Sequence, residues 1–397
     1  MSSSLFKTSL AVRFHLLQVL AMGKQTQAKK RRRAITLGSD FSGLGTSSLA
    51  MKKLCDPVNL NFKTTFTCDN NRACTKILKH NFKPAKHYPD ILKRNVKEME
   101  SVDVYVFTAE CQSFTSNGKQ EGLADARGLL IYEAVDYIKQ KKPRCFMSEN
   151  ASSLGSKFKH VSDEIVHILR NDYEMHVEQL NTDEYAIPQH RSRWYMLGVR
   201  KDVLRRNGLQ LLLADGRPSC KWFPKPMTVT IPFDRFVTRL PDHMWKTFPT
   251  GRTEVERARA KENIETGIFH VASRHNINPF IKPVVIDIGC SPQYRSVSID
   301  SVNTLTRTRC GYFAYWCTTK GGPLNSSEMA RLQGIEDGDI DWRGAGGVSE
   351  SAYAAALGNA QSVNVIMALL PNLMALAKVV SIEEAQAMKK VWLHSFE

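Results

Sequence analysis

Short apolar runs alternate with segments whose apolar positions recur at helical spacing over the first half of the chain. The runs predict strands at Ala34–Leu37, Lys63–Thr67, Val102–Phe107, Cys145–Met147, Tyr173–Gln179 and Trp194–Val199, and the spaced segments predict helices at Ser47–Leu54, Arg72–Phe82, Leu129–Gln140 and Phe158–Arg170. Strands that alternate with helices build a mostly parallel sheet with helices on both faces. The sequence therefore predicts an α/β fold with a Rossmann-like sheet.

The rhythm stops between Lys201 and Ser296, where prolines, basic residues and aromatic residues are interleaved. Such interleaving is compatible with nucleic-acid contact, although the same aromatics could instead form a small satellite core. We predict a second, smaller and irregular domain at 201–294, between two parts of the main domain at 34–200 and 295–380. A long apolar helix at Val363–Val379 is expected to complete the packing, and 381–397 should form a C-terminal helix or tail.

The charge is unevenly spread. The 397 residues carry a net charge of +16, which favours a polyanionic partner. Half of that excess lies in residues 1–33, which hold eight Lys and Arg and no acid. We expect this arm to lie outside the fold. Its run Lys29–Arg33 predicts nuclear import, and its acid-free start leaves an organelle transit peptide open.

Composition narrows the chemistry further. No apolar run is long enough to span a bilayer, so we expect no membrane partner. Nine cysteines are scattered without a C-x-x-C pair, which predicts neither a disulfide framework nor a zinc site. We therefore expect a metal-free protein in a reducing compartment, acting as a monomer.

Candidate ligand-binding residues follow the first two predicted strands and precede the third. Phe41-Ser42-Gly43-Leu44-Gly45 could let the backbone approach a ligand at a helix N-terminus, although a plain tight turn is an equal alternative. Asp69 and Asn70 end the second strand, where an acid can accept hydrogen bonds from ribose hydroxyls or cap the next helix. Asp90 and Ile91 precede the central strand, and Asp90 could bind an exocyclic amine or remain a solvated turn residue.

Candidate reactive residues follow the central strand and its neighbours. Cys111, with Gln112 and Ser113, lies just beyond the carboxyl end of a buried strand, where open α/β sheets place reactive groups. A buried cysteine can equally be a small hydrophobe. Glu149, followed by Asn150, ends an apolar strand, and a glutamate is costly to bury without a partner or a task.

A third group of polar residues precedes the strand at 194–199. Gln189, Arg191 and Arg193 suit the recognition of a polar base edge or a phosphate. For either arginine, a surface ion pair is the alternative.

In this order the motifs resemble those of the C5-cytosine methyltransferases that use S-adenosylmethionine, over roughly 35–379. The resemblance implies a cofactor site at Phe41, Ser42, Gly43, Leu44, Gly45, Asp69, Asn70, Asp90, Ile91, Asn359 and Ala360. It implies catalytic roles for Cys111, Glu149, Arg191 and Arg193, and substrate contacts by Gln112, Ser113, Asn150 and Gln189. Arg331-Leu332-Gln333-Gly334 and Gly358-Asn359 match the two C-terminal motifs, and 201–294 then corresponds to the target-recognition domain.

The resemblance also implies a mechanism on cytosine in duplex DNA. The Cys111 thiolate adds to C6, and the C5 carbon then takes the methyl group from the sulfonium. Glu149 holds N3 and the exocyclic amine, and Arg193 contacts O2. Because the target atom is hidden in a duplex, the base must be flipped out.

Some residues depart from the family pattern and leave two alternatives open. Glu110 stands where the family has proline, and a carboxylate beside Cys111 disfavours the thiolate. A catalytically impaired homologue that binds cofactor and DNA as a regulatory protein is the first alternative. Phe114-Thr115 replaces the commoner Phe-Ser, and with the small recognition segment it leaves an RNA (tRNA) cytosine methyltransferase as the second. Ala151 and Ala360 replace a valine and a serine and look tolerable.

Overall fold

The computed structural model describes residues 33–109, 126–205, 222–227, 231–239, 253–291, 293–294 and 296–395. The chain divides into two units, residues 1–34 and 35–397, and the described strands and helices belong to the second. The predicted residues Glu110, Cys111, Gln112 and Ser113 lie outside the described residues.

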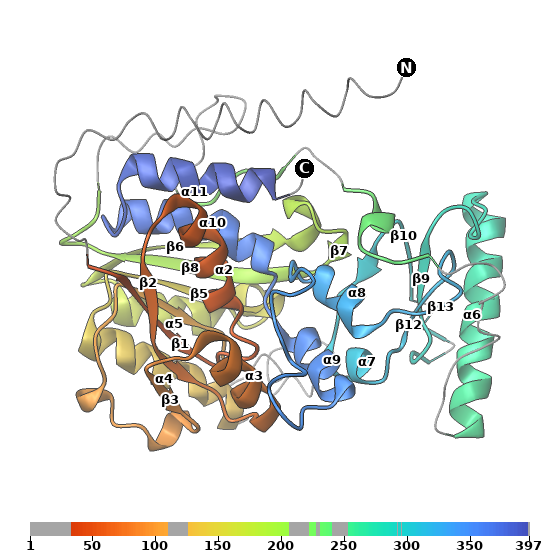
Figure 1. The fold of residues 1–397 in the computed structure, drawn as a ribbon, viewed down its shortest axis with the longest axis horizontal. Helices are drawn as coiled ribbons and strands as arrows, with labels where there is room; N and C mark the ends of the chain where they lie inside the picture. Colours follow the sequence, from red (N-terminus) through yellow and green to blue (C-terminus); the bar gives the residue numbers. More distant parts are fainter. Residues whose placement is uncertain are drawn as a thin grey trace. The chain divides into compact units, whose positions relative to one another are not determined.

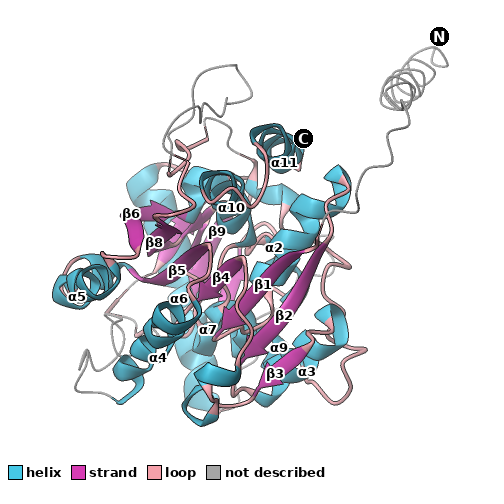
Figure 2. Cartoon of the chain, turned by 90° about the vertical axis from the view of Figure 1, so that its left-hand side faces the viewer, coloured by secondary structure: helices cyan, strands magenta, loops and turns pink. Residues whose placement is uncertain are grey.

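A seven-stranded sheet forms the centre of the second unit (Figures 1 and 2). Its order is β3-β2-β1-β4-β5-β8-β6, with β3 to β5 parallel, β8 antiparallel to β5, and β6 antiparallel to β8. The strands are β1 (Ile35–Asp40), β2 (Phe62–Cys68), β3 (Lys86–Tyr88), β4 (Val104–Phe107), β5 (Cys145–Ala151), β6 (Tyr173–Asn181) and β8 (Ser192–Arg200). The predicted α/β fold with a Rossmann-like sheet is confirmed.

Both faces of the sheet are covered because its central strands are apolar on both sides. In β4, Val104 and Val106 join one hydrophobic cluster while Tyr105 and Phe107 join the other, as the period of two along a strand requires. One cluster contains α2 (Thr46–Cys55), α10 (Val363–Leu376) and α11 (Ile382–His394), and the other contains α4 (Ala126–Lys141) and α5 (Lys159–Leu169). The fold thus has three layers, and α3 (Arg72–Phe82) lies between β2 and β3 in the chain.

A second, smaller sheet has the order β10-β9-β12-β13 and is antiparallel throughout. Its strands are β9 (Val284–Asp287), β10 (Val297–Ile299), β12 (Tyr315–Cys317) and β13 (Gly322–Pro323), and α6 (Glu254–His275) packs on it through Ala260 and Ile264 (Figure 1). Two strands come from 315–323, a segment expected in the main domain. The proposed division at residue 294 stays a prediction.

Helix α6 is the element that the sequence pattern missed. The segment was expected to be irregular, yet it holds a helix of 22 residues. Its start carries a capping box in which Thr253 and Glu256 each bond the other's backbone N–H. The helix buries only a narrow stripe, Ala260, Asn263, Ile264, Gly267 and Val271, so few apolar residues mark it in the sequence.

Shorter elements join the two sheets. They are β7 (Gln189–His190) and β11 (Val302–Asn303), which pair in parallel, with α7 (Arg307–Gly311), α8 (Ser326–Arg331) and α9 (Glu350–Asn359). Among the helices that the structure describes, none alone is long and apolar enough to cross a membrane; only α9 and α10 together, bent by 46°, pass by length and composition.

Candidate active site

A cleft of about 1880 Å³ opens at the carboxyl ends of β1 to β5. The predicted cofactor and catalytic residues that line it are Phe41, Gly43, Asp69, Asn70, Asp90, Ile91, Glu149, Arg191, Arg193 and Asn359. The others in described parts of the chain, Ser42, Leu44, Gly45, Asn150, Gln189 and Ala360, do not line it. All six of these are buried, so their contacts are with protein.

We call the loop Phe41–Gly45 the cofactor loop. Its backbone conformation restricts which amino acids can occupy it. Phe41 has φ 55°, a left-handed conformation that is uncommon for a bulky residue and that clusters at functional sites. A Cβ at Gly43 would meet nothing within 4 Å, so the backbone there is open. A Cβ at Gly45 would lie 2.7 Å from the ring of Phe82, which excludes any side chain.

Hydrogen bonds fix the cofactor loop to the two strands beside it. The Ser42 amide donates to the carbonyl of Cys68 at 2.9 Å, and the Cys68 amide donates to Ser42 Oγ at 3.1 Å. On the other side, Thr108 Oγ1 donates to the carbonyl of Phe41 at 2.9 Å. The loop therefore spans the ends of β2, β1 and β4.

Asp69 connects the cofactor loop to the start of α3. Its Oδ2 accepts from the Gly43 amide at 2.7 Å and its Oδ1 accepts from the Asn71 amide at 2.8 Å. Burial raises the pKa of the Asp69 carboxyl, and these two backbone bonds oppose the rise. The alternative role of helix cap belongs to Asn71, whose Oδ1 accepts from Ala73 and Cys74.

Asp90 begins a short turn at the edge of the cleft. We call Asp90 and Ile91 the 90–91 turn. Asp90 Oδ1 accepts from the Leu92 amide at 3.0 Å, and its other oxygen lies 3.6 Å from Lys93 Nζ. The Ile91 side chain is buried. A half-exposed carboxylate beside an apolar side chain is suited to an amine-bearing aromatic ring.

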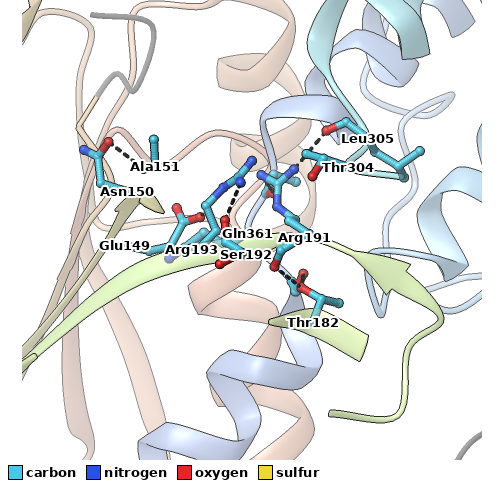
Figure 3. Close-up of polar contacts among 12 residues, drawn as sticks. Glu149, Asn150, Ala151, Thr182, Arg191, Ser192, Arg193, Thr304, Leu305 and Gln361 are labelled. Carbon is cyan, nitrogen blue, oxygen red and sulfur yellow. Dashed lines mark hydrogen bonds and ion pairs between the residues drawn. The ribbon is translucent and has the colours of Figure 1, made fainter. Parts of the chain in front are cut away.

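Glu149 and Arg193 meet at the other end of the cleft (Figure 3). In the β5–β8 pair, Glu149 lies opposite Tyr195, and Arg193 is two residues from Tyr195 along β8, so Glu149 and Arg193 share one face. Arg193 Nε lies 3.2 Å from Glu149 Oε1. Burial raises the pKa of the Glu149 carboxyl, and Arg193 and Arg191 oppose the rise. A carboxyl in this state can exchange a proton with a ring nitrogen.

Asn150 points away from Glu149 and ties the end of β5 to the end of β4. Its Nδ2 donates to the carbonyl of Ala109 at 3.1 Å, and its Oδ1 accepts from its neighbour's amide at 2.8 Å. Ala109 is the last described residue before the predicted nucleophile. Asn150 therefore fixes the position of Ala109, the described residue closest in sequence to Cys111.

The Arg191 side chain donates to backbone carbonyls (Figure 3), and most hydrogen bonds of the Gln189 side chain are also to backbone. Arg191 donates to the carbonyls of Leu305 at 2.9 Å, Ala360 at 2.8 Å and Gly358 at 3.4 Å. Gln189 donates to the carbonyl of Leu332 at 2.7 Å and accepts from the Leu305 amide at 3.0 Å. The two side chains thus fasten the C-terminal motifs to β8.

The side of the cleft next to the small sheet has lining residues that were not predicted, among them Asp287, Cys290, Tyr294 and Arg307. Asp287 accepts from Arg309 Nε at 2.9 Å. The signal was present, because an apolar run, Val284–Ile286, is closed by an acid as the run before Asp69 is. Inside a segment expected to be irregular, that pattern did not stand out.

The family model for C-5 cytosine-specific DNA methylases matches residues 35–375. The chain belongs to this family. The order of the seven strands and the position of the cleft agree with that membership, and so do the motifs from the cofactor loop to Gly358-Asn359.

Similar proteins cover the chain to different extents. The type II methyltransferase M.HhaI of Haemophilus parahaemolyticus is 30% identical over 172 residues, which is 42% of this chain and 50% of that protein. The type II methyltransferase M1.ScrFI of Lactococcus lactis subsp. cremoris is 29% identical over 177 residues, 43% of each. The matches thus span half or less of these relatives.

Solved structures with the same fold cover more of the chain. The S. pombe Dnmt2 methyltransferase has a TM-score of 0.58 at 16% identity, covering 86% of this chain and 98% of that one. The Entamoeba histolytica methyltransferase EhMeth has a TM-score of 0.58 at 15% identity, with the same coverage. At these identities the likeness concerns the fold.

The C5-cytosine methyltransferase family uses S-adenosylmethionine as its methyl donor. The residues that line the cleft fit S-adenosylmethionine. The backbone is open at Gly43, the Asp69 oxygens each keep a second lone pair for ribose hydroxyls, and the 90–91 turn offers a carboxylate and an apolar side chain for adenine.

Proposed function

We propose that this chain transfers the methyl group of S-adenosylmethionine to C5 of cytosine in DNA. The observation that carries the proposal is the pair Glu149–Arg193, 3.2 Å apart, in the same cleft as the cofactor loop. A carboxyl that can carry a proton and a guanidinium beside it match the N3, exocyclic amine and O2 edge of cytosine. Family membership supports the same reaction class.

The proposed reaction begins at Cys111. Its thiolate forms an S–C6 bond, and the electrons of the C5–C6 double bond move to C5. Glu149 stabilises this adduct by donating a proton toward N3, while Arg193 contacts O2. The bound cofactor supplies an electrophilic methyl group. As C5 takes the methyl group, the S–CH3 bond of the donor breaks and leaves a neutral thioether. C5 then loses its proton to a water molecule, the C5–C6 double bond re-forms as the S–C6 bond breaks, N3 returns its proton to Glu149, and Cys111 leaves as the thiolate. Base flipping brings the cytosine from the duplex to these residues.

A catalytically impaired homologue is the second candidate, and Glu110 favours it. A carboxylate next to Cys111 raises the free energy of the thiolate. Such a protein would bind S-adenosylmethionine through the cofactor loop, Asp69 and the 90–91 turn, and would bind DNA without methylating it.

The test is a methyl-transfer assay with labelled S-adenosylmethionine and duplex DNA, run with tRNA as a competing substrate. We expect 5-methylcytosine in DNA from the wild type and none from Cys111→Ala. Cofactor binding without product in either nucleic acid would establish the impaired homologue. Product in tRNA alone would establish an RNA methyltransferase.

A further inference from the structure

Three polar side chains meet in the core below the cofactor loop. Asp40 is the last residue of β1 and directly precedes Phe41, and Arg94 follows the 90–91 turn. Arg94 Nη1 donates to Asp40 Oδ1 at 2.5 Å, and the Tyr105 hydroxyl of β4 donates to Asp40 Oδ2. The side chains of Asp40 and Arg94 have no exposed surface. The Asp40 carboxylate therefore accepts from both Arg94 and Tyr105.

Arg94 also reaches a third element. Its Nη2 donates to the carbonyl of Glu133 in α4 at 3.2 Å, and its guanidinium lies over the ring of Tyr137, 5.8 Å from the centroid. One side chain thus joins the end of β1, the segment that follows the 90–91 turn, and α4. Two of these elements lead directly into residues that line the cleft.

Stability alone gives no reason for such a network. Burial raises the pKa of the Asp40 carboxyl, and Arg94 and Tyr105 oppose the rise. A buried ion pair loses the hydration of both charges, and apolar residues of similar volume are often as stable in its place. A buried pair does, however, fix the relative position of the elements that carry it, because either charge alone is costly.

We infer that Arg94 is a positioning residue for cofactor binding, because through Asp40 it holds the 90–91 turn against the cofactor loop. The inference rests on the proposed function, since that function needs both elements to contact one S-adenosylmethionine. The cofactor loop supplies open backbone at Gly43, and the turn supplies Asp90. Their spacing decides whether one ligand can touch both. The Arg94 fork is a side-chain link between them, beside the hydrogen bonds that join Gly43 to Asp69 and Asp69 to Tyr88.

The test separates positioning from stability. We compare the full-length wild type with Arg94→Met and with the apolar variant Asp40→Leu/Arg94→Met/Tyr105→Phe. Lys142→Met is the matched control, because it breaks an exposed ion pair with Asp172. For each protein, Tm is measured by calorimetry, and the Kd values of S-adenosylmethionine and S-adenosylhomocysteine by titration.

We expect Arg94→Met to lower Tm by about 10 °C, because it leaves Asp40 buried with one partner fewer. The apolar variant should recover Tm to within a few degrees, yet bind both cofactor forms about tenfold more weakly, since one lost positioning contact costs roughly one factor of ten. Its kcat at saturating cofactor should change less than its Kd. Lys142→Met should match the wild type in both measurements.

An apolar variant with recovered Tm and wild-type Kd would overturn the inference and leave the network a structural one. If that variant stays unstable, Arg94→Lys decides. A lysine keeps the charge but cannot bond Asp40 and the Glu133 carbonyl as a fork does. Weaker cofactor binding at wild-type Tm supports positioning, and wild-type Kd contradicts it. A wild type that binds cofactor but methylates nothing overturns the proposed function alone, and one that binds no cofactor overturns both.

Discussion

The two ends of the cleft are held in place by different kinds of contact. At the cofactor end, Ser42 and Asp69 bond the backbone of the neighbouring loops, and a buried ion pair lies below. At the other end, Glu149 and Arg193 meet as charged side chains on paired strands. The cofactor end is therefore fixed by backbone geometry. The other end, which we call the base end, consists of the charged side chains of Glu149 and Arg193. A bound substrate can change the protonation and the pairing of these two groups.

This difference separates binding from chemistry. A change at the cofactor end should alter affinity for S-adenosylmethionine and leave the rate at saturating cofactor nearly unchanged. A change at the base end should lower this rate and leave the affinity for S-adenosylmethionine nearly unchanged, because protonation of the cytosine ring contributes only in the transition state. Changes at residues between the ends, such as Arg191, should affect the stability of the fold more than cofactor affinity or rate.

The largest effect is expected at Glu149. Glu149→Gln removes the proton that the adduct needs and should lower kcat about 1000-fold, the usual range for a positioned acid. The Kd of S-adenosylmethionine should stay within about twofold, since the cofactor end is untouched. Steady-state kinetics and titration measure the two quantities, with the exposed Glu178→Gln as the control. Equal losses in both would break the separation of the two ends.

The next effect concerns two arginines two positions apart, Arg191 just before β8 and Arg193 within it. Arg191→Met should lower the free energy of unfolding by about 3 kcal/mol, because three buried carbonyls lose a charged donor. Arg193→Met should lower it by only about 1 kcal/mol, since its partner Glu149 can take up a proton. Urea titration measures both. Similar losses in the two variants would contradict the assignment of Arg191 to the scaffold.

A smaller effect is expected at Asp69. Asp69→Asn keeps one oxygen for a backbone amide but loses the charge and an acceptor for ribose hydroxyls. The Kd of S-adenosylmethionine should rise about 20-fold, the size of one charged hydrogen bond, while kcat at saturating cofactor holds. A control is Asp172→Asn, at an exposed ion pair. Unchanged affinity would remove Asp69 from the cofactor site.

The smallest effect is the pH dependence of stability that Glu149 causes. Its folded pKa is raised by burial, with Arg193 and Arg191 opposing, so the folded protein holds this proton when the unfolded chain has lost it. The stabilisation is complete below the unfolded pKa and is lost as pH rises through the folded pKa. The wild type should therefore lose stability relative to Glu149→Gln over this window. Parallel stability curves for the two proteins would show that the pKa is not raised.

Local patterns predicted the elements that depend on neighbours in sequence. Helix α3 has the bounds Arg72–Phe82 that its spacing predicts, and the cofactor loop follows its strand as expected. Helix α6 escaped because its buried stripe is narrow and its other faces are charged. The pattern of apolar residues reports burial, and an element that buries little leaves little trace.

The site was less predictable because its contacts cross long stretches of chain. Spacing could not tell Arg191 from Arg193, since their roles depend on carbonyls at 305–360 and on a carboxylate at 149. Asp40 and Arg94 are 54 positions apart, and only the folded sheet brings them together. The roles of Cys111, Gln112 and Ser113 stay predictions.

The most direct test of a cytosine-5 methyltransferase is covalent trapping. A duplex that contains 5-fluorocytosine is incubated with S-adenosylmethionine and the wild type, Cys111→Ala or Glu110→Pro, and stable adducts are resolved by denaturing electrophoresis. Fluorine at C5 cannot leave as the proton does, so the S–C6 bond persists. We predict an adduct with the wild type and none with Cys111→Ala. An adduct with Glu110→Pro but none with the wild type would contradict the account, and the chain would then act by binding alone.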